Sequence, residues 1–318
     1  MTFTHSFRRR LSKFAIAGAL AAAAVLAGGT AQAQKALDLS PEQPDRLRGE
    51  QDPKAIAAIP KDYKFVKEGE LTIGLAPSRP PLTFYATDAR TVIGYHADLA
   101  QLLADSLGRK LTLVPVAWAD WPLGLTSGRF DGVISNVTVT EERKEKYDFA
   151  TYRQDLLGLY VKTDSTLPPL KDPKDVAGLR LITDPGTNQE RILLEWDKRN
   201  VAAGLKPIEV QYYDDDAVRA LAIESGRADG IFSVNATLAH EASLKGKLKS
   251  LGTINGGWPR TAEIAVTTKK GNGLVDAFAI AINDLIANGK QAQILERWNL
   301  SAEAVDKSIV NPPGLPKF

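Results

Sequence analysis

The chain has 318 residues with a formal net charge of +2, and it contains no cysteine and only three histidines. Disulfides, thiolate zinc sites and a cysteine nucleophile are therefore excluded, and the small net charge gives no reason to expect nucleic acid or anionic lipid as a partner. A chain of about 300 residues buries about 75% of its unfolded surface and usually divides into two domains.

Residues 1–33 have the pattern of a secretory signal peptide. Four basic side chains within 8–13 precede an apolar run over 14–28, and Ala31-Gln32-Ala33 provides a small-residue cleavage site. The apolar run is short for a bilayer span of about 20 residues, so we expect cleavage rather than a retained anchor. Cleavage removes four Lys and Arg side chains and no acidic one, which takes the formal net charge from +2 to −2. The general and the twin-arginine export routes both fit this segment.

A polar leader is predicted over 34–69, which contains four prolines and is expected to be poorly ordered or to wrap over the surface. The folded part begins near Glu70. Apolar runs predict strands there, and one amphipathic helix stops at a glycine. The expected elements of this first set are strands over 71–75, 110–116, 131–137 and 155–162 and a helix over 98–107.

A second alternating set follows. It is predicted to contain strands over 179–183, 208–213, 230–234 and 262–268, with a helix after the turn 184–187, a helix capped by Asp215 or Asp216, a long helix ending at 288–289 and a short one over 294–298. Strands that alternate with helices predict parallel sheets covered on both faces, and two such sets predict two α/β lobes. Ligands of open α/β sheets bind beyond the carboxyl ends of the strands, so the polar segments 77–84, 135–143 and 185–189 are expected to face one cleft.

The segment 128–149 is the most informative part of the chain. An apolar strand leads into Ser135, Asn136 and Thr138, and Arg143 follows at the start of an expected helix. Hydroxyls, an amide, free backbone N–H groups and a guanidinium form a suitable site for a small carboxylate. Because none of these groups needs to act as acid, base or nucleophile, the pattern indicates solute capture rather than catalysis.

Five motifs in register over residues 70–300 support a specific resemblance. The chain resembles the family 3 extracellular solute-binding proteins, the periplasmic receptors of polar amino-acid ABC importers. The matching motifs are Gly94-Tyr95-His96-Ala97-Asp98-Leu99, Leu125-Thr126-Ser127-Gly128-Arg129-Phe130-Asp131, Thr138-Val139-Thr140-Glu141-Glu142-Arg143 with Asp148-Phe149, Gly226-Arg227-Ala228-Asp229, and Lys270-Gly271-Asn272.

The resemblance implies a type II periplasmic binding protein fold, with two Rossmann-like lobes joined by two crossover strands. Lobe 1 would hold 70–160 and 263–318, and lobe 2 would hold 161–262. The lobes would close by hinge motion on a carboxylate-bearing solute, and the loaded periplasmic monomer would deliver it to an inner-membrane ABC permease. Neither enzymatic activity nor a cofactor is implied.

The resemblance also assigns roles to residues. Arg143 would grip the ligand's α-carboxylate with its planar fork of donors, the alternative being a surface arginine paired with Glu141 or Glu142. Ser135, Asn136 and Thr138 would line the same pocket, unless they only cap the end of a strand.

Two further groups of residues complete the expected pocket. Thr187 and Asn188, at a helix N-terminus, would bind the same carboxylate from lobe 2 unless they form only a capped turn. Trp121 would form an apolar wall of the pocket and Trp118 is a second ligand-binding candidate, with core or interlobe packing as the alternative for both.

Two positions depart from the family pattern. Arg79 stands where many relatives carry an aromatic residue, and Asn235 stands where amino-acid receptors usually place an aspartate for the α-ammonium. A gained cation and a lost carboxylate shift the expected preference toward anionic ligands such as acidic derivatives, opine-like conjugates or carboxylates. This expectation weakens if Arg79 points to solvent.

Other functions are less well supported. His96 and His240 are isolated in the sequence, so no metal cluster is expected. The runner-up function is that of the periplasmic cyclohexadienyl dehydratases, which share the fold and would use Glu190 as an acid on a prephenate-like substrate. A sensor domain is a third alternative, although no membrane helix or kinase segment follows.

Overall fold

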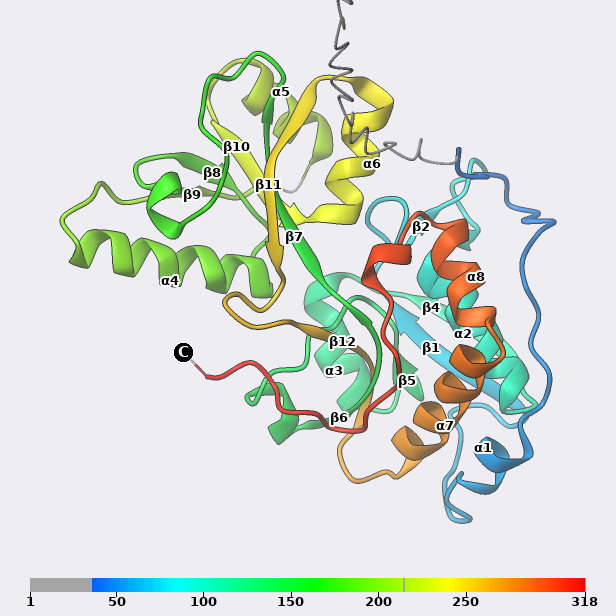
Figure 1. Ribbon diagram of the computed structural model, residues 1–318. Coiled ribbons are helices and arrows are strands. Elements are labelled where there is room, and N and C mark those ends of the chain that lie inside the picture. The colour runs from blue at the N-terminus through cyan, green and yellow to red at the C-terminus, as the bar shows by residue number, and fades with distance from the viewer. Residues whose placement is uncertain (1–35, 214, 318) are drawn as a thin grey trace, which may run out of the picture. The chain divides into compact units, whose positions relative to one another are not determined.

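Two five-stranded sheets organise the chain in the computed structural model, which describes residues 36–213 and 215–317 (Figure 1). The predicted signal peptide lies outside the described residues. The first sheet has the strand order β4-β1-β5-β12-β6 and the second the order β11-β7-β10-β8-β9. We call the part built on the first sheet lobe 1 and the part built on the second sheet lobe 2.

The first sheet is covered on both faces, as predicted. Neighbouring residues of one strand point to opposite faces, and Phe149 and Ala150 belong to different apolar clusters, as do Ala265 and Val266. Its strands are β1 (Glu70–Leu75), β4 (Lys110–Pro115), β5 (Gly132–Val133), β6 (Tyr147–Gln154) and β12 (Glu263–Lys269). Its helices are α2 (Tyr95–Ser106), α3 (Trp121–Thr126), α7 (Leu274–Ala287) and α8 (Lys290–Arg297).

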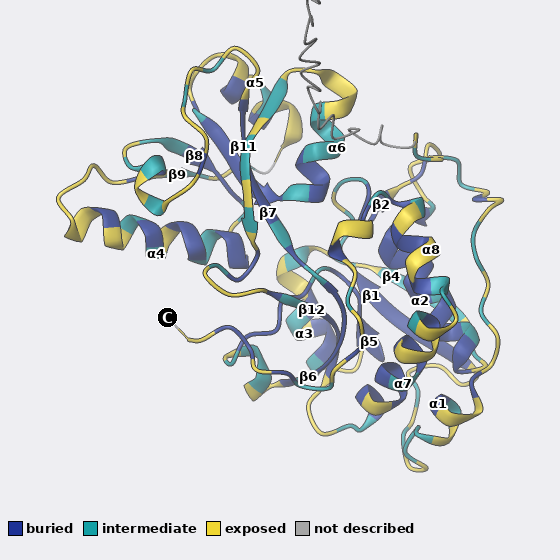
Figure 2. Cartoon of the chain, in the orientation of Figure 1, coloured by how far each residue is buried: buried dark blue, intermediate teal, exposed yellow. Residues whose placement is uncertain are grey.

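The second sheet is built in the same way. Phe232 packs with Trp196 on one face, while its neighbour Ile231 joins Tyr160 and Ala222 on the other. Its strands are β7 (Leu156–Lys162), β8 (Arg180–Ile182), β9 (Glu209–Gln211), β10 (Gly230–Val234) and β11 (Leu248–Asn255). Its helices are α4 (Asn188–Ala202), α5 (Asp216–Glu224) and α6 (Asn235–Lys245), and Figure 2 shows buried and exposed residues alternating along α4.

The two lobes are joined by two crossovers. Asp155 alone separates β6 from β7, and residues 256–262 connect β11 to β12. Because the chain passes between sheets in opposite directions, β12 runs antiparallel to β6, and β7 runs antiparallel to β10 and β11. The prediction of purely parallel sheets was therefore wrong for these strands. Strands β6 and β11 and helix α6 were not predicted.

Several lobe 1 contacts hold the leader segment 36–69 against the domain. It contains α1 (Pro53–Ala57), capped by Asp52, which packs against α7. Arg46 pairs with Asp98 at 2.8 Å, and Tyr63 donates a hydrogen bond to Asp131 at 3.0 Å. Through these contacts the leader lies along the surface of lobe 1. A small hairpin of β2 (Phe84–Tyr85) and β3 (Val92–Ile93) follows β1.

None of the helices within 36–213 and 215–317 combines the length and apolar character that a bilayer crossing requires.

Candidate functional site

The loop after β5 has a backbone that aims polar groups to one side. The strand predicted over 131–137 ends at Val133, because Asn136 takes a left-handed conformation with φ of 56°. Thr138 then pairs with Ile264 in a single antiparallel bridge that uses the N–H groups of Val139 and Ala265. In such a bridge the N–H and C=O of Thr138 point away from the partner strand.

Arg143 occupies that same side. Its Nη1 donates to the carbonyl oxygen of Thr138 at 2.9 Å, and its own backbone N–H donates to Thr140 Oγ1 at 3.1 Å. It begins a 3-10 turn (Arg143–Glu145) rather than the α-helix that was expected. The guanidinium therefore lies on the same side of the chain as the N–H of Thr138.

Two tryptophans flank the guanidinium. The carbon at its centre lies 5.8 Å from the ring centres of both Trp118 and Trp121, within reach of a cation–π interaction. Trp121 is buried and also packs on Tyr147, with ring centres 5.0 Å apart, whereas Trp118 is partly exposed. Both tryptophans are thus placed beside Arg143.

No carboxylate among the described residues lies within ion-pair distance of Arg143, although the charge of Glu142 acts on it weakly. Glu141 pairs with Lys144 at 3.1 Å, and Glu142 lies 3.6 Å from Arg191 of α4. Burial, and secondarily the positive charge of Arg191, lower the pKa of Arg143 to about 10, so the guanidinium keeps its proton at neutral pH. A partly buried cation without an anionic partner of its own can accept a carboxylate from a ligand.

The side chains of Ser135 and Asn136 form contacts within the protein. Ser135 Oγ accepts a hydrogen bond from the N–H of Ala76, which ties this loop to the loop after β1. The side-chain amide of Asn136 contacts Arg153 and Asp155. Their side chains therefore shape the loop.

Lobe 2 contributes the N-terminus of α4. Thr187 is its N-cap: its hydroxyl accepts from the N–H of Glu190 at 3.3 Å and donates to the carbonyl of Asp184 at 2.6 Å. Asn188 is buried and donates from Nδ2 to the carbonyl of Gly256 in the second crossover. Its Oδ1 has no hydrogen-bond partner among the described residues.

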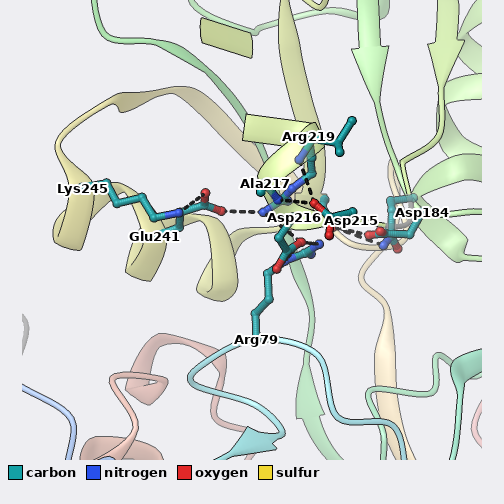
Figure 3. A network of polar contacts seen from close by, with 11 residues as sticks. Arg79, Asp184, Asp215, Asp216, Ala217, Arg219, Glu241 and Lys245 are labelled. Carbon is teal, nitrogen blue, oxygen red and sulfur yellow. Dashed lines mark hydrogen bonds and ion pairs between the residues drawn. The ribbon is translucent and has the colours of Figure 1, made fainter. Parts of the chain in front are cut away.

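Arg79 is engaged by a carboxylate of lobe 2 (Figure 3). Its Nε lies 2.9 and 3.1 Å from the two carboxylate oxygens of Asp216, the first residue of α5, and its Nη2 contacts the same group. Asp216 also approaches Arg219, which pairs with Glu241 at 2.7 Å. Arg79 is therefore not a free cation in this structure, and the expected preference for anionic ligands loses support.

We expect the Arg79–Asp216 pair to contribute about 0.2–1 kcal/mol to stability, because Asp216 is largely exposed. A double-mutant cycle of Arg79→Ala and Asp216→Ala, measured by urea unfolding, gives this coupling energy. It should fall in 1 M NaCl, where the Debye length is about 3 Å. Asp215→Asn is the matched control, because Asp215 only caps α5. A coupling that is zero at low salt would contradict this expectation.

Asn235 and its surroundings show an acidic group that sequence reasoning missed. Asn235 Oδ1 accepts from the hydroxyl of Tyr160 at 3.0 Å. Two residues earlier, Ser233 Oγ donates to Asp184 Oδ2 at 3.1 Å, and Asp184 is partly exposed. The sequence predicted a binding role for Thr187 and Asn188 of this turn but none for Asp184, because nothing local indicates that Asp184 contacts the end of β10.

The residues that the dehydratase alternative or a metal site would use are engaged in other contacts. Glu190 accepts hydrogen bonds from the N–H of Gly186 at 2.7 Å and the hydroxyl of Tyr212 at 2.6 Å. His96 is buried and shares a hydrogen bond with Thr83 Oγ1, and burial holds its pKa well below its ordinary value. Within the described part of the chain, no three His, Cys, Asp or Glu side chains gather as metal ligands.

Known proteins resemble this chain over most of its length. The family of bacterial extracellular solute-binding proteins, family 3, matches residues 71–301. The L-cystine-binding protein TcyJ of Escherichia coli (strain K12) is 32% identical over 237 residues, which cover 74% of this chain and 84% of the relative. The cyclohexadienyl dehydratase of Pseudomonas aeruginosa is 25% identical over 58% of this chain and 65% of its own length.

Solved structures agree with the architecture. An ancestral arginine-binding protein bound to arginine superposes with a TM-score of 0.62 and 25% identity, covering 73% of this chain and 98% of that protein. The predicted two-lobed fold of a type II periplasmic binding protein is thus confirmed.

Proposed function

Because the chain belongs to the bacterial extracellular solute-binding proteins of family 3, we propose that it captures a small α-amino acid or amino-acid derivative for an ABC importer. The observation that carries the proposal is Arg143, whose guanidinium has no carboxylate partner among the described residues. The ligand's α-carboxylate would supply that partner, with the N–H of Thr138 beside it and Asn188 approaching from lobe 2. Trp121 and Trp118 would border the ligand's side chain.

The ligand's α-ammonium would be held on the lobe 2 side by Asp184. Asn235, at the usual place of an acid, has its amide oxygen occupied by Tyr160. The Asp184 carboxylate is oriented by Ser233 and remains partly exposed. With Arg79 neutralised by Asp216, the site would suit a zwitterion better than a purely anionic solute. Ser135 and Asn136 would act by shaping the loop, and Thr187 by capping α4.

The cellular context follows from the same proposal. Residues 1–33 would direct export to the periplasm and then be removed. The expected lobe boundary at 160/161 would move to the first crossover at Asp155, because β7 belongs to the second sheet, so lobe 1 would comprise 70–154 and 263–318 and lobe 2 would begin at 156. The protein would act as a monomer that closes on its ligand and presents it to an inner-membrane permease. The protein would have no catalytic role, since Glu190 has its oxygens engaged by Gly186 and Tyr212.

A thermal-shift screen of the mature protein tests this function. Amino acids, including cystine and the basic ones, are compared with opines and simple organic acids. A true ligand at 100 times its Kd should stabilise the native state by about 2.7 kcal/mol. Turnover of prephenate would instead favour the dehydratase alternative, and the absence of any shift with amino acids or their derivatives would contradict the proposal.

A further inference from the structure

Arg153, near the end of β6, carries a guanidinium that is completely buried. A charge removed from water in this way is stable only when hydrogen bonds and opposite charges surround it. Its Nη2 donates to Asn136 Oδ1, and its Nη1 contacts the carboxylate of Glu303 and donates to the carbonyl of Gln154 at 3.2 Å. Asp155 lies 3.6 Å from the same Nη1.

This cluster joins three distant parts of the sequence. Glu303 ends a 3-10 turn (Ser301–Glu303) that follows α8, and it is itself buried. Asp155 is the single residue between β6 and β7, and Asn136 belongs to the loop after β5. The guanidinium is therefore the common point at which the C-terminal segment, the first crossover and the binding loop meet.

Asn136 has the most unusual backbone of the binding loop. Its left-handed φ of 56° is uncommon for a residue with a side chain, and asparagine tolerates it best when its amide forms a compensating hydrogen bond. Here the amide oxygen receives that bond from Arg153, and the amide nitrogen lies 3.5 Å from Asp155. The turn at Asn136 decides the direction of the residues that follow, including Thr138 and its contact with Arg143.

We propose that Arg153 is a positioning residue of the ligand site, which holds Asn136 in its left-handed conformation and thereby aims the N–H of Thr138 and the guanidinium of Arg143 at the ligand's carboxylate. The role rests on the proposed function, but the conformation it maintains exists without any ligand. Arg153 itself contacts no ligand, since its side chain is enclosed by protein.

A double-mutant cycle on affinity tests the coupling. Arg153→Met should weaken binding of the amino acid found by the thermal-shift screen by at least about tenfold, because small displacements of a binding group have large effects. In an Asn136→Ala background the same change should alter Kd by less than about twofold, since the two residues act as one unit. Arg153→Lys keeps the positive charge but lacks the planar set of guanidinium N–H donors, so its Kd should lie between those of the wild type and Arg153→Met.

Arg297→Met is the matched control, because Arg297 also approaches a buried carboxylate of lobe 1, that of Asp98, at 3.3 Å, but lies outside the Asn136 cluster. It should lower the melting temperature without changing Kd. Equal losses of affinity in both variants would show general destabilisation and would overturn the proposal. An unchanged Kd in Arg153→Met would overturn it as well.

A ligand-free measurement separates this role from the proposed function. The backbone amide NMR signals of Asn136 and Thr138 should shift in Arg153→Met and stay in place in Arg297→Met. If Arg153→Met does not fold, Glu303→Gln should shift the same two signals. Shifted signals in a protein that binds no amino acid would refute the proposed function and leave the positioning role standing, whereas unshifted signals would refute the positioning role.

Discussion

Replacing Arg143 by alanine is expected to abolish tight binding of the amino-acid ligand. Truncating one partner of a buried, hydrogen-bonded charge pair costs about 2–5 kcal/mol, so Kd should rise about 30-fold to several thousand-fold. The guanidinium donates to the Thr138 carbonyl and lies beside two tryptophan rings, and none of these groups can replace it as a donor to a carboxylate. Isothermal titration calorimetry measures the change directly.

Two further variants sharpen this test. Arg143→Lys keeps a positive charge but cannot offer the planar fork, so its Kd should fall between those of the wild type and Arg143→Ala. Arg129→Ala removes an exposed arginine from the same lobe and should leave Kd unchanged within about twofold. An affinity for the ligand that is the same in Arg143→Ala as in the wild type would exclude Arg143 as the carboxylate anchor.

Replacing Asp131 by alanine is expected to destabilise lobe 1 by about 3 kcal/mol, because it leaves buried donors without an acceptor. Asp131 is buried and accepts three hydrogen bonds: from Tyr63 Oη at 3.0 Å, from the N–H of Val66 at 3.0 Å and from the N–H of Thr72 at 2.8 Å. Two of these donors belong to the leader, so the loss should also loosen the part of the leader that contains Tyr63 and Val66. Urea unfolding gives the free energy, and proteolysis reports whether cleavage within 36–69 becomes faster.

Asp88 provides a well-matched control for this prediction. It also accepts three hydrogen bonds, from Arg90 and Thr91, but it is exposed to solvent. Water can replace Asp88 as an acceptor, so Asp88→Ala should change stability far less. If both variants were equally stable, the proposed dependence of lobe 1 on the buried Asp131 would be wrong.

The local pattern of the sequence was sufficient for much of the fold. The segment 71–75, with Leu71, Ile73 and Leu75, predicted β1, the 3.6-residue periodicity over 98–107 predicted most of α2, and the five motifs predicted the family. These features depend on which residues of one element are buried, and the buried positions recur in the sequence at the spacing typical of a helix or a strand.

The sequence was misleading where a charge or a polar residue is satisfied by a distant partner. Strand β6 was not predicted, and its buried Arg153 is satisfied by Asn136, Asp155 and Glu303, of which Glu303 lies 150 positions later in the chain. The strand expected over 131–137 is shorter because Asn136 turns the chain. Arg79 was expected to be available to a ligand, but it forms an ion pair with Asp216 of lobe 2.

By itself, the sequence determined the family, the two α/β lobes and the loop that carries Arg143, because periodicity and motif spacing are local properties. Only the tertiary structure decided which charged side chains form ion pairs and which carboxylate is hydrogen-bonded at the end of β10, where Ser233 donates to Asp184. Ion pairs and hydrogen bonds form between side chains that are far apart in the chain, and their strength depends on burial that the whole fold creates.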